Sequence, residues 1–368
     1  MVKKKLPIEY NSNLPIGIIS DDPFAFLIHT RLFDNVRIVS DMKLNWLDEL
    51  DLGSSRDVLN TSSKTTGDSK RLTQTKKFTE LVKSDPKRKY IMYGPIDPPY
   101  KVNPLTFLMN SPTIAHAYEN KRYFRDEFAD LIRMPEYEIK YVDELDKAAA
   151  YKELNEKYGA FVMQDEESSG SKGTYIIKNH DHYVEAVTGL KRTSYSRSVV
   201  ISKFIEGLTH SVQVCITKYG IFSSGVQKQL VDSEFLCNTK LQGATRWCGG
   251  ELGVEYPDIV QHQATEMATI VGSELASHGY KGIFGIDIIL TPENEVYAIE
   301  INARHTGYSH VISDMQLKQG KIPFMLLHVL ELANQPYEVT DLDSLPSVNN
   351  NKKPVSYLII NNRSNEPV

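Results

Sequence analysis

The sequence predicts a mixed α/β protein with more than one domain. Its 368 residues suffice for two or three domains with hydrophobic cores, and its apolar and charged fractions, 41% and 24%, are those of an ordinary soluble protein. Short apolar, β-branched runs typical of strands alternate with segments whose apolar residues recur at helical spacing. The composition becomes strongly polar over residues 53–75, and the organisation changes again from Ser111.

Charge, cysteine content and hydropathy exclude several classes of protein. The net charge of -5 and the lack of a long basic run argue against a nucleic-acid scaffold. Cys215, Cys237 and Cys248 are too few and too scattered for a disulfide framework or a zinc site, and we interpret them as buried or incidental thiols in a reducing cytoplasm. No run of eighteen apolar residues occurs, and residues 1–13 have the charges of a signal peptide without its apolar segment. We therefore expect a cytoplasmic protein with no nucleic-acid or membrane partner.

Residues 1–110 are predicted to form a first, smaller α/β domain. Asp21 and Asp22 are candidate helix starts, the apolar residues of 24–33 recur at helical spacing, and residues 53–75 are predicted to be a loop. A plain solvated connector is preferred over a binding role for this loop. Strands are predicted at 15–20, 36–39 and 90–93. The domain has no Gly-x-Gly-x-x-Gly fingerprint, so no dinucleotide is assigned to it.

The most informative stretch is a predicted hairpin at residues 283–302. Two apolar runs, 283–290 and 295–302, flank a turn, and antiparallel register places Asp287 across from Glu300 on one face. Asn302 shares that face. Two carboxylates and an amide oxygen are hard ligands suited to Mg²⁺ or Mn²⁺, which usually retain waters and substrate phosphates as further ligands.

Arg304 continues the alternation onto the same face, where it could hold phosphate oxygens. The alternative is an ordinary hairpin whose polar residues face water. The apolar neighbourhood favours the site, because carboxylates among Ile, Phe and Val are costly unless they have partners.

A second signal lies between the predicted strands 159–164 and 175–178. Residues 168–174 are small, hydroxylated or glycine apart from Lys172, so their backbone amides could wrap phosphate oxygens. The alternative for this loop is a Ser/Gly hairpin turn without a ligand.

An Asp on one strand followed by Glu-Ile-Asn-Ala-Arg on the next resembles the metal-binding end of the ATP-grasp fold. Further parts follow in that family's order: Lys121 at a helix start, the phosphate loop, and an apolar strand that runs into a linker at 199–207. The resemblance covers roughly residues 111–333. It implies an N-terminal domain at 1–110, two α+β ATP-grasp subdomains at 111–203 and 204–335, and a C-terminal linker and strand at 336–368.

The resemblance also implies roles for individual residues. The metal ligands would be Asp287, Glu300 and Asn302, and the catalytic residues Arg304, Lys172 and Arg246. The predicted ATP-binding residues are Lys121, Gln164, Ser169, Gly170, Ser171, Lys172, Gly173, Thr174, Lys203, Phe204, Ile205, Glu206 and His210.

Several of these roles have alternatives. For Lys121 taken alone, a surface lysine is the default interpretation. His210 is as well explained as a half-buried strand residue, and Arg246 as a member of a surface ion pair. The chain also departs from the family at two places: Gln164 stands where a Lys is usual, and Ser202 where an acidic residue is frequent. The first departure removes a charge near phosphate.

The implied function is ligation with ATP and Mg²⁺ or Mn²⁺. ATP would phosphorylate a carboxylate, and an amine or other nucleophile would attack the acyl phosphate. The expected partners are small carboxylate and amine substrates, amino-acid or peptide-like, with a carrier protein and a homodimer as further expectations. Two alternatives stay open: another ATP-grasp chemistry, carboxylation or phosphoryl transfer, and a catalytically weak nucleotide-binding module.

Overall fold

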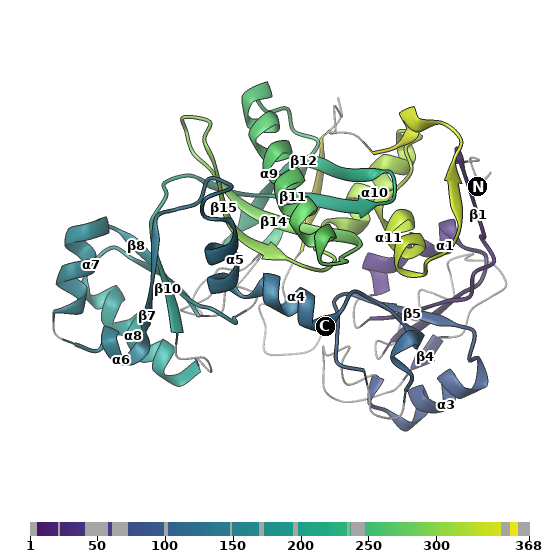
Figure 1. Cartoon of the computed structure of the whole chain (residues 1–368), viewed down its shortest axis with the longest axis horizontal. Helices are drawn as coiled ribbons and strands as arrows, with labels where there is room; N and C mark the ends of the chain where they lie inside the picture. Colours follow the sequence, from purple (N-terminus) through teal and green to yellow (C-terminus); the bar gives the residue numbers. More distant parts are fainter. Residues whose placement is uncertain are drawn as a thin grey trace.

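Four β-sheets organise the part of the chain that the structure describes (Figure 1). The structure is a computed structural model, and it describes residues 6–20, 23–40, 58–60, 73–98, 102–147, 149–168, 173–193, 198–233, 236, 247–346 and 354–359. A four-stranded sheet lies at one end of the molecule, a six-stranded sheet in the middle, and a five-stranded sheet at the other end (Figure 1).

The five-stranded sheet is parallel, with the order β4-β3-β2-β5-β6. Its strands are β2 (Ile16–Ile19), β3 (Val36–Ser40), β4 (Val58–Asn60), β5 (Lys89–Met92) and β6 (Phe107–Leu108), accompanied by α3 (Lys76–Ser84) and η3 (Pro104–Thr106). Parallel strands are usually covered on both faces, and Ile16, Ile18 and Ile91 are accordingly fully buried. The strands predicted near 16–20, 36–39 and 90–93 are confirmed.

Two local predictions in this region were wrong. The segment 24–33 is not one helix, but a 3-10 turn, η1 (Pro23–Phe26), followed by the single turn α1 (His29–Leu32). Its apolar residues are buried in the shared core, so their spacing reflects burial rather than helix length. The segment 53–75, predicted to be a loop, contains strand β4. Most of the rest of this segment lies outside the described residues, and so do the candidate helix starts Asp21 and Asp22.

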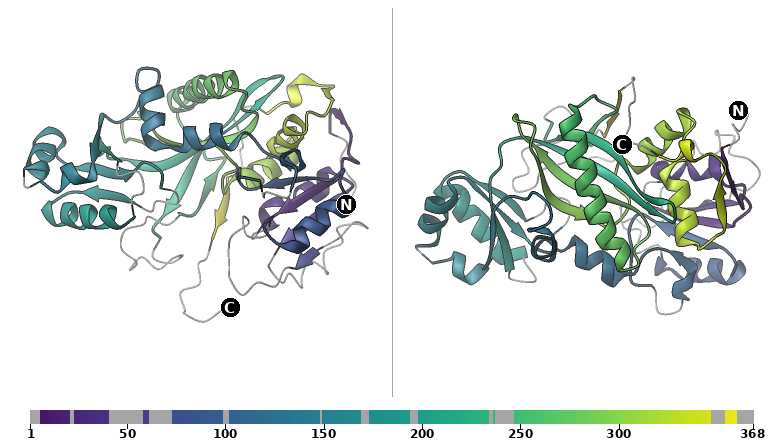
Figure 2. Two further views of the ribbon diagram at one scale, coloured as in Figure 1. Left: turned by 60° about the horizontal axis from the view of Figure 1, so that its bottom comes forward. Right: turned by 45° about the horizontal axis from the view of Figure 1, so that its top comes forward.

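The four-stranded sheet is antiparallel, with the order β7-β10-β8-β9. Its strands are β7 (Tyr137–Tyr141), β8 (Phe161–Asp165), β9 (Thr174–Ile177) and β10 (Ser198–Lys203), and α6 (Val142–Leu145), α7 (Ala150–Tyr158) and α8 (His180–Thr193) pack with them. Figure 2 shows these helices together beside the sheet, at the end of the molecule away from the N-terminal unit. Strands β8, β9 and β10 confirm the strands predicted on either side of the phosphate loop and before the linker.

The six-stranded antiparallel sheet has the order β15-β14-β11-β12-β13-β17. Its strands are β11 (Leu208–Thr217), β12 (Gly220–Val231), β13 (Trp247–Leu252), β14 (Gly282–Leu290), β15 (Val296–Asn302) and β17 (Val355–Leu358). Helix α9 (Asp258–Ser277) lies along this sheet and buries its Met267, Val271 and Leu275 (Figures 1 and 2). Asp258 is the first residue of that helix, and Pro257 occupies the cap position.

Helices α10 (Ser309–Lys318) and α11 (Phe324–Leu332) join the central sheet to the N-terminal unit. Every residue of α11 from Phe324 to Glu331 is buried, since the helix is enclosed in the core shared by the two units. Helices α4 (Pro112–Glu119) and α5 (Lys121–Phe128) lead from the N-terminal unit towards the four-stranded sheet (Figure 1).

Two pairings link distant parts of the sequence. The short strand β1 (Ile8–Tyr10) pairs with β16 (Tyr337–Val339), which precedes η4 (Leu342–Ser344), and β17 joins the edge of the central sheet by pairing with β13. Within the described part of the chain, none of the helices has the length and hydropathy that a membrane crossing requires.

Candidate active site

The hairpin β14–β15 brings three of the predicted ligands together. Asp287 pairs with Glu300 as predicted, and Gly285 pairs with Asn302. The register shifts by one residue between Asp287 and Ile288, so a bulge aligns the two carboxylates at the end of the hairpin. Asn302 Nδ2 donates to Asp287 Oδ2 at 3.0 Å, and Gln229 Nε2 from β12 donates to Oδ1 at 2.8 Å.

The two carboxylates are crowded and poorly solvated. Burial raises the pKa of Asp287 to about 8, and the neighbouring negative charge of Glu300 adds to the shift. Burial also opposes ionisation of Glu300, but Lys121, the hydrogen bond with Asp287 and Arg304 outweigh it and lower the pKa of that carboxyl. Two adjacent hard-oxygen donors whose charges repel each other fit a divalent cation, which would neutralise both. Among the described residues, no group of three or more His, Cys, Asp or Glu side chains is arranged to hold a metal ion, so the amide of Asn302 is the third candidate ligand beside the two carboxylates.

Lys121 is buried, not a surface lysine. Its side chain is 4% exposed, and its Nζ lies 3.5 Å from Glu300 Oε2 and donates to the carbonyl of Ser168. The backbone amide of Lys121 donates to the carbonyl of Glu166, which fixes the start of α5 against the end of β8. A lysine at the entrance of the predicted phosphate loop and beside a candidate metal ligand is well placed to hold phosphate oxygens.

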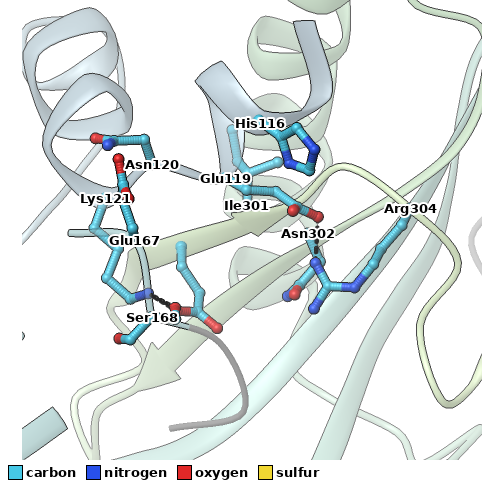
Figure 3. Close-up of a pocket in the computed structure, with 10 residues that line it drawn as sticks. His116, Glu119, Asn120, Lys121, Glu167, Ser168, Ile301, Asn302 and Arg304 are labelled. Atoms are coloured by element: carbon cyan, nitrogen blue, oxygen red, sulfur yellow. Dashed lines mark hydrogen bonds and ion pairs between the residues drawn. The ribbon is translucent and has the colours of Figure 1, made fainter. Parts of the chain in front are cut away.

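A cavity of about 330 Å³ contains these groups (Figure 3). Its walls are formed by His116, Glu119, Asn120, Lys121, Glu167, Ser168, Glu300, Ile301, Asn302 and Arg304. The guanidinium of Arg304 forms an ion pair with Glu119, as Figure 3 shows. The cavity therefore combines two candidate metal ligands, Glu300 and Asn302, with two cations, each already paired with a carboxylate. Asp287 adjoins the cavity through its hydrogen bond with Asn302.

The phosphate loop is only partly described. Ser169, Gly170, Ser171 and Lys172 lie outside the described residues, and so does Arg246. Gly173 has a φ of 72°, and an added Cβ would lie 3.0 Å from Asp165 Cβ, so this position requires glycine. Thr174 pairs across the sheet with Gln164, whose Nε2 lies 3.5 Å from Thr174 Oγ1.

The predicted adenine linker follows β10. The backbone amides of Lys203 and Phe204 donate to the carbonyls of Glu136 and Ala160, so these two amides are already engaged within the protein. Glu206 is exposed. Ser202, which stands where the family often has an acidic residue, is 3% exposed within the sheet.

His210 lies in a different environment from the cavity. It is 2% exposed in β11, its Nδ1 is 2.9 Å from the carbonyl of Leu208, and its ring packs edge-on against Tyr256. Burial lowers its pKa, so the imidazole is neutral at physiological pH. His210 does not line the cavity described above, which favours the strand-residue alternative.

The sequence reasoning missed three side chains at this site. Glu119 pairs with Arg304, and Gln229 donates to Asp287. Arg125 is fully buried, and its Nη1 donates to the carbonyl of Ile299 at 2.6 Å. Burial lowers the pKa of Arg125 to about 10, although the negative charge of Glu300 acts to raise it. Glu119 lies two residues before Lys121, so it was close to a residue that the sequence had singled out.

Comparison with known proteins tests the family directly. A family model described as an ATP-grasp domain matches residues 118–308, more than half of the chain. The chain is a member of the ATP-grasp family. This ATP-grasp protein therefore uses ATP with Mg²⁺, in an ATP-dependent ligation or carboxylation whose type the family alone does not specify. None of the curated proteins matches the sequence.

Solved structures share the fold of this ATP-grasp protein at low sequence identity. Biotin carboxylase from Campylobacter jejuni has a TM-score of 0.64 and 14% identity, over 91% of this chain and 73% of that one. An L-amino acid ligase from Bacillus licheniformis has a TM-score of 0.56 and 15% identity, over 93% and 77%. N5-carboxyaminoimidazole synthetase from Staphylococcus aureus has a TM-score of 0.57 and 11% identity, over 90% and 82%. At these identities the likeness concerns the fold alone.

Proposed function

We propose that this ATP-grasp protein is an ADP-forming carboxylate-amine ligase that acts on amino-acid or peptide-like substrates. The observation that supports it most is the grouping of Glu300 and Asn302 with Lys121 and Arg304 around one cavity, with Asp287 bonded to Asn302 beside it. Asp287, Glu300 and Asn302 would hold Mg²⁺, which supplies charge neutralisation at the transferred phosphoryl group.

The residues of the chain have separable tasks in this proposal. Lys121 binds phosphate oxygens, and the loop 168–174 would wrap the triphosphate and exclude water. The substrate carboxylate attacks the γ-phosphorus and ADP leaves; the amine then attacks the acyl carbon, and inorganic phosphate leaves as the nitrogen loses a proton. Arg304 stabilises the negative charge on the acyl phosphate. Lys172 and Arg246 keep their proposed catalytic roles, and Lys203–Glu206 their proposed place around the adenosine.

The experiment is a screen for ADP formation in the presence of Mg²⁺. Amino acids, small acids and amines are supplied singly and in pairs, with bicarbonate as a separate donor. A ligase produces ADP and phosphate in equal amounts only with a donor and an acceptor, and adding hydroxylamine to a donor alone traps the acyl phosphate as a hydroxamate. Turnover with bicarbonate in place of other carboxylates would favour carboxylation. ATP binding without ADP formation under every condition would favour the nucleotide-binding module and refute ligation.

A further inference from the structure

The tripeptide Glu119-Asn120-Lys121 forms two ion pairs with the end of β15 and the residues that follow it. Lys121 pairs with Glu300, and Glu119 pairs with Arg304, four residues further along the same segment. Asn120 fixes the turn between them, because its side-chain oxygen accepts from the amide of Tyr123 and caps α5. Figure 3 shows the side chains of Glu119 and Lys121 extending from this turn into the cavity.

Arg304 interacts with the carboxylates of both Glu119 and Glu300. Its aliphatic stem packs against the backbone of Gly94, where an added Cβ would lie 3.2 Å from Arg304 Cδ. Its guanidinium pairs with Glu119, and the charges of Arg304 and Glu300, which line the same cavity, also influence each other. With a side-chain exposure of 23%, the guanidinium needs a carboxylate partner within the protein.

We propose that Glu119 is a positioning residue, which holds Arg304 away from the Asp287–Glu300 pair and so keeps that pair open to Mg²⁺. The inference rests on the metal site of the proposed function. If Glu119 is removed, the guanidinium loses its ion-pair partner and turns to Glu300, which lines the same cavity and already acts on its charge. Glu300 is a candidate metal ligand, so Arg304 would then compete with Mg²⁺ for it.

The test measures how much Mg²⁺ tightens nucleotide binding. Calorimetry gives the Kd of a non-hydrolysable ATP analogue with Mg²⁺ and with EDTA in the full-length chain. For Glu119→Ala we expect the Mg²⁺-bound affinity to fall about tenfold, a change of about 1.4 kcal/mol, while the affinity in EDTA stays unchanged. Glu119→Gln, which retains an acceptor without the charge, should show a smaller loss.

Two further variants separate positioning from a general structural role. In the double variant Glu119→Ala/Arg304→Ala, the Mg²⁺ effect should equal that of Arg304→Ala alone, because no guanidinium remains to compete. Glu156→Ala removes a carboxylate from the exposed ion pair with Lys152 on α7, and should leave the Mg²⁺ effect unchanged. Thermal melting of each variant checks the fold, and Glu119→Gln carries the test if Glu119→Ala does not fold.

Each outcome is decisive. A Glu119→Ala variant with the wild-type Mg²⁺ effect overturns the inference, as does a loss that persists when Arg304 is also absent. If the wild-type chain binds the ATP analogue with the same Kd in Mg²⁺ and in EDTA, both the inference and the proposed metal site are overturned. A clear Glu119 effect in a protein that forms no ADP with any donor and acceptor overturns the ligase function and supports the positioning role.

Discussion

Three buried histidines predict a steep loss of stability at mildly acidic pH. His29 and His305 are 0% and 2% exposed, and His305 stacks edge-on against His328 with ring centroids 4.3 Å apart. Burial lowers the pKa of His29 to about 4 and of His305 to about 3, and it lowers the pKa of His328 as well. Nε2 of His29 and of His305 are buried without a hydrogen-bond partner among the described residues.

The sign of the effect follows from linkage. Each histidine takes up a proton near pH 6.5 when unfolded but only well below that when folded, so acid favours the unfolded chain. Above pH 6.5 both states are neutral and the contribution vanishes. At pH 5 the unfolded form gains about 2 kcal/mol per histidine, and His29 and His305 together account for about 4 kcal/mol. That is a large share of a typical unfolding free energy of about 5–15 kcal/mol.

The assay is urea denaturation at several pH values between 7.5 and 5. We expect the free energy of unfolding to change little above pH 7 and to fall progressively below pH 6.5. The comparison variant is His29→Gln, which removes one titrating group, so that its loss between pH 7.5 and 5 should be about 2 kcal/mol smaller than in the wild type. Comparing slopes makes the result independent of any constant cost of the substitution. A variant with the same pH dependence as the wild type would refute the assignment of a neutral, buried His29.

Three further substitutions test the site. Glu300→Gln should abolish ADP formation and leave the melting temperature within a few degrees of wild type, and retained activity would contradict the metal assignment. Gln164→Lys should tighten ATP binding, because it restores a charge near phosphate; calorimetry that gives an equal or weaker affinity would argue against its placement. Gly173→Ala should cost about 1–2 kcal/mol in chemical denaturation, because its left-handed backbone disfavours a side chain and Asp165 stands close by. An unchanged free energy of unfolding for that variant would mean that the loop adopts another conformation.

The sequence was sufficient to predict an element where its apolar residues recur with the period of the strand or helix that buries them. The apolar runs of β14 and β15, with the turn between them, predict the pairing of Asp287 with Glu300. The structure confirms that pair, but reaches it through a one-residue bulge that the sequence did not predict. The apolar residues of α9 likewise recur with helical period and face one sheet. These features depend on the side-chain periods of strands and helices, which the sequence carries directly.

Only the tertiary structure shows which side chains contact the β14–β15 hairpin. Periodicity could not distinguish the buried Lys121 from a surface lysine, because its burial depends on Glu300 and the carbonyl of Ser168, far along the chain. Nor could it show that Glu119 pairs with Arg304, or that β1 pairs with β16. Ion pairs and strand pairings between distant segments depend on how whole elements pack, and no local pattern records that packing. The sequence by itself determined the hairpin and its ligand chemistry; the packing of α4 and α5 against β15 decided which charges surround it.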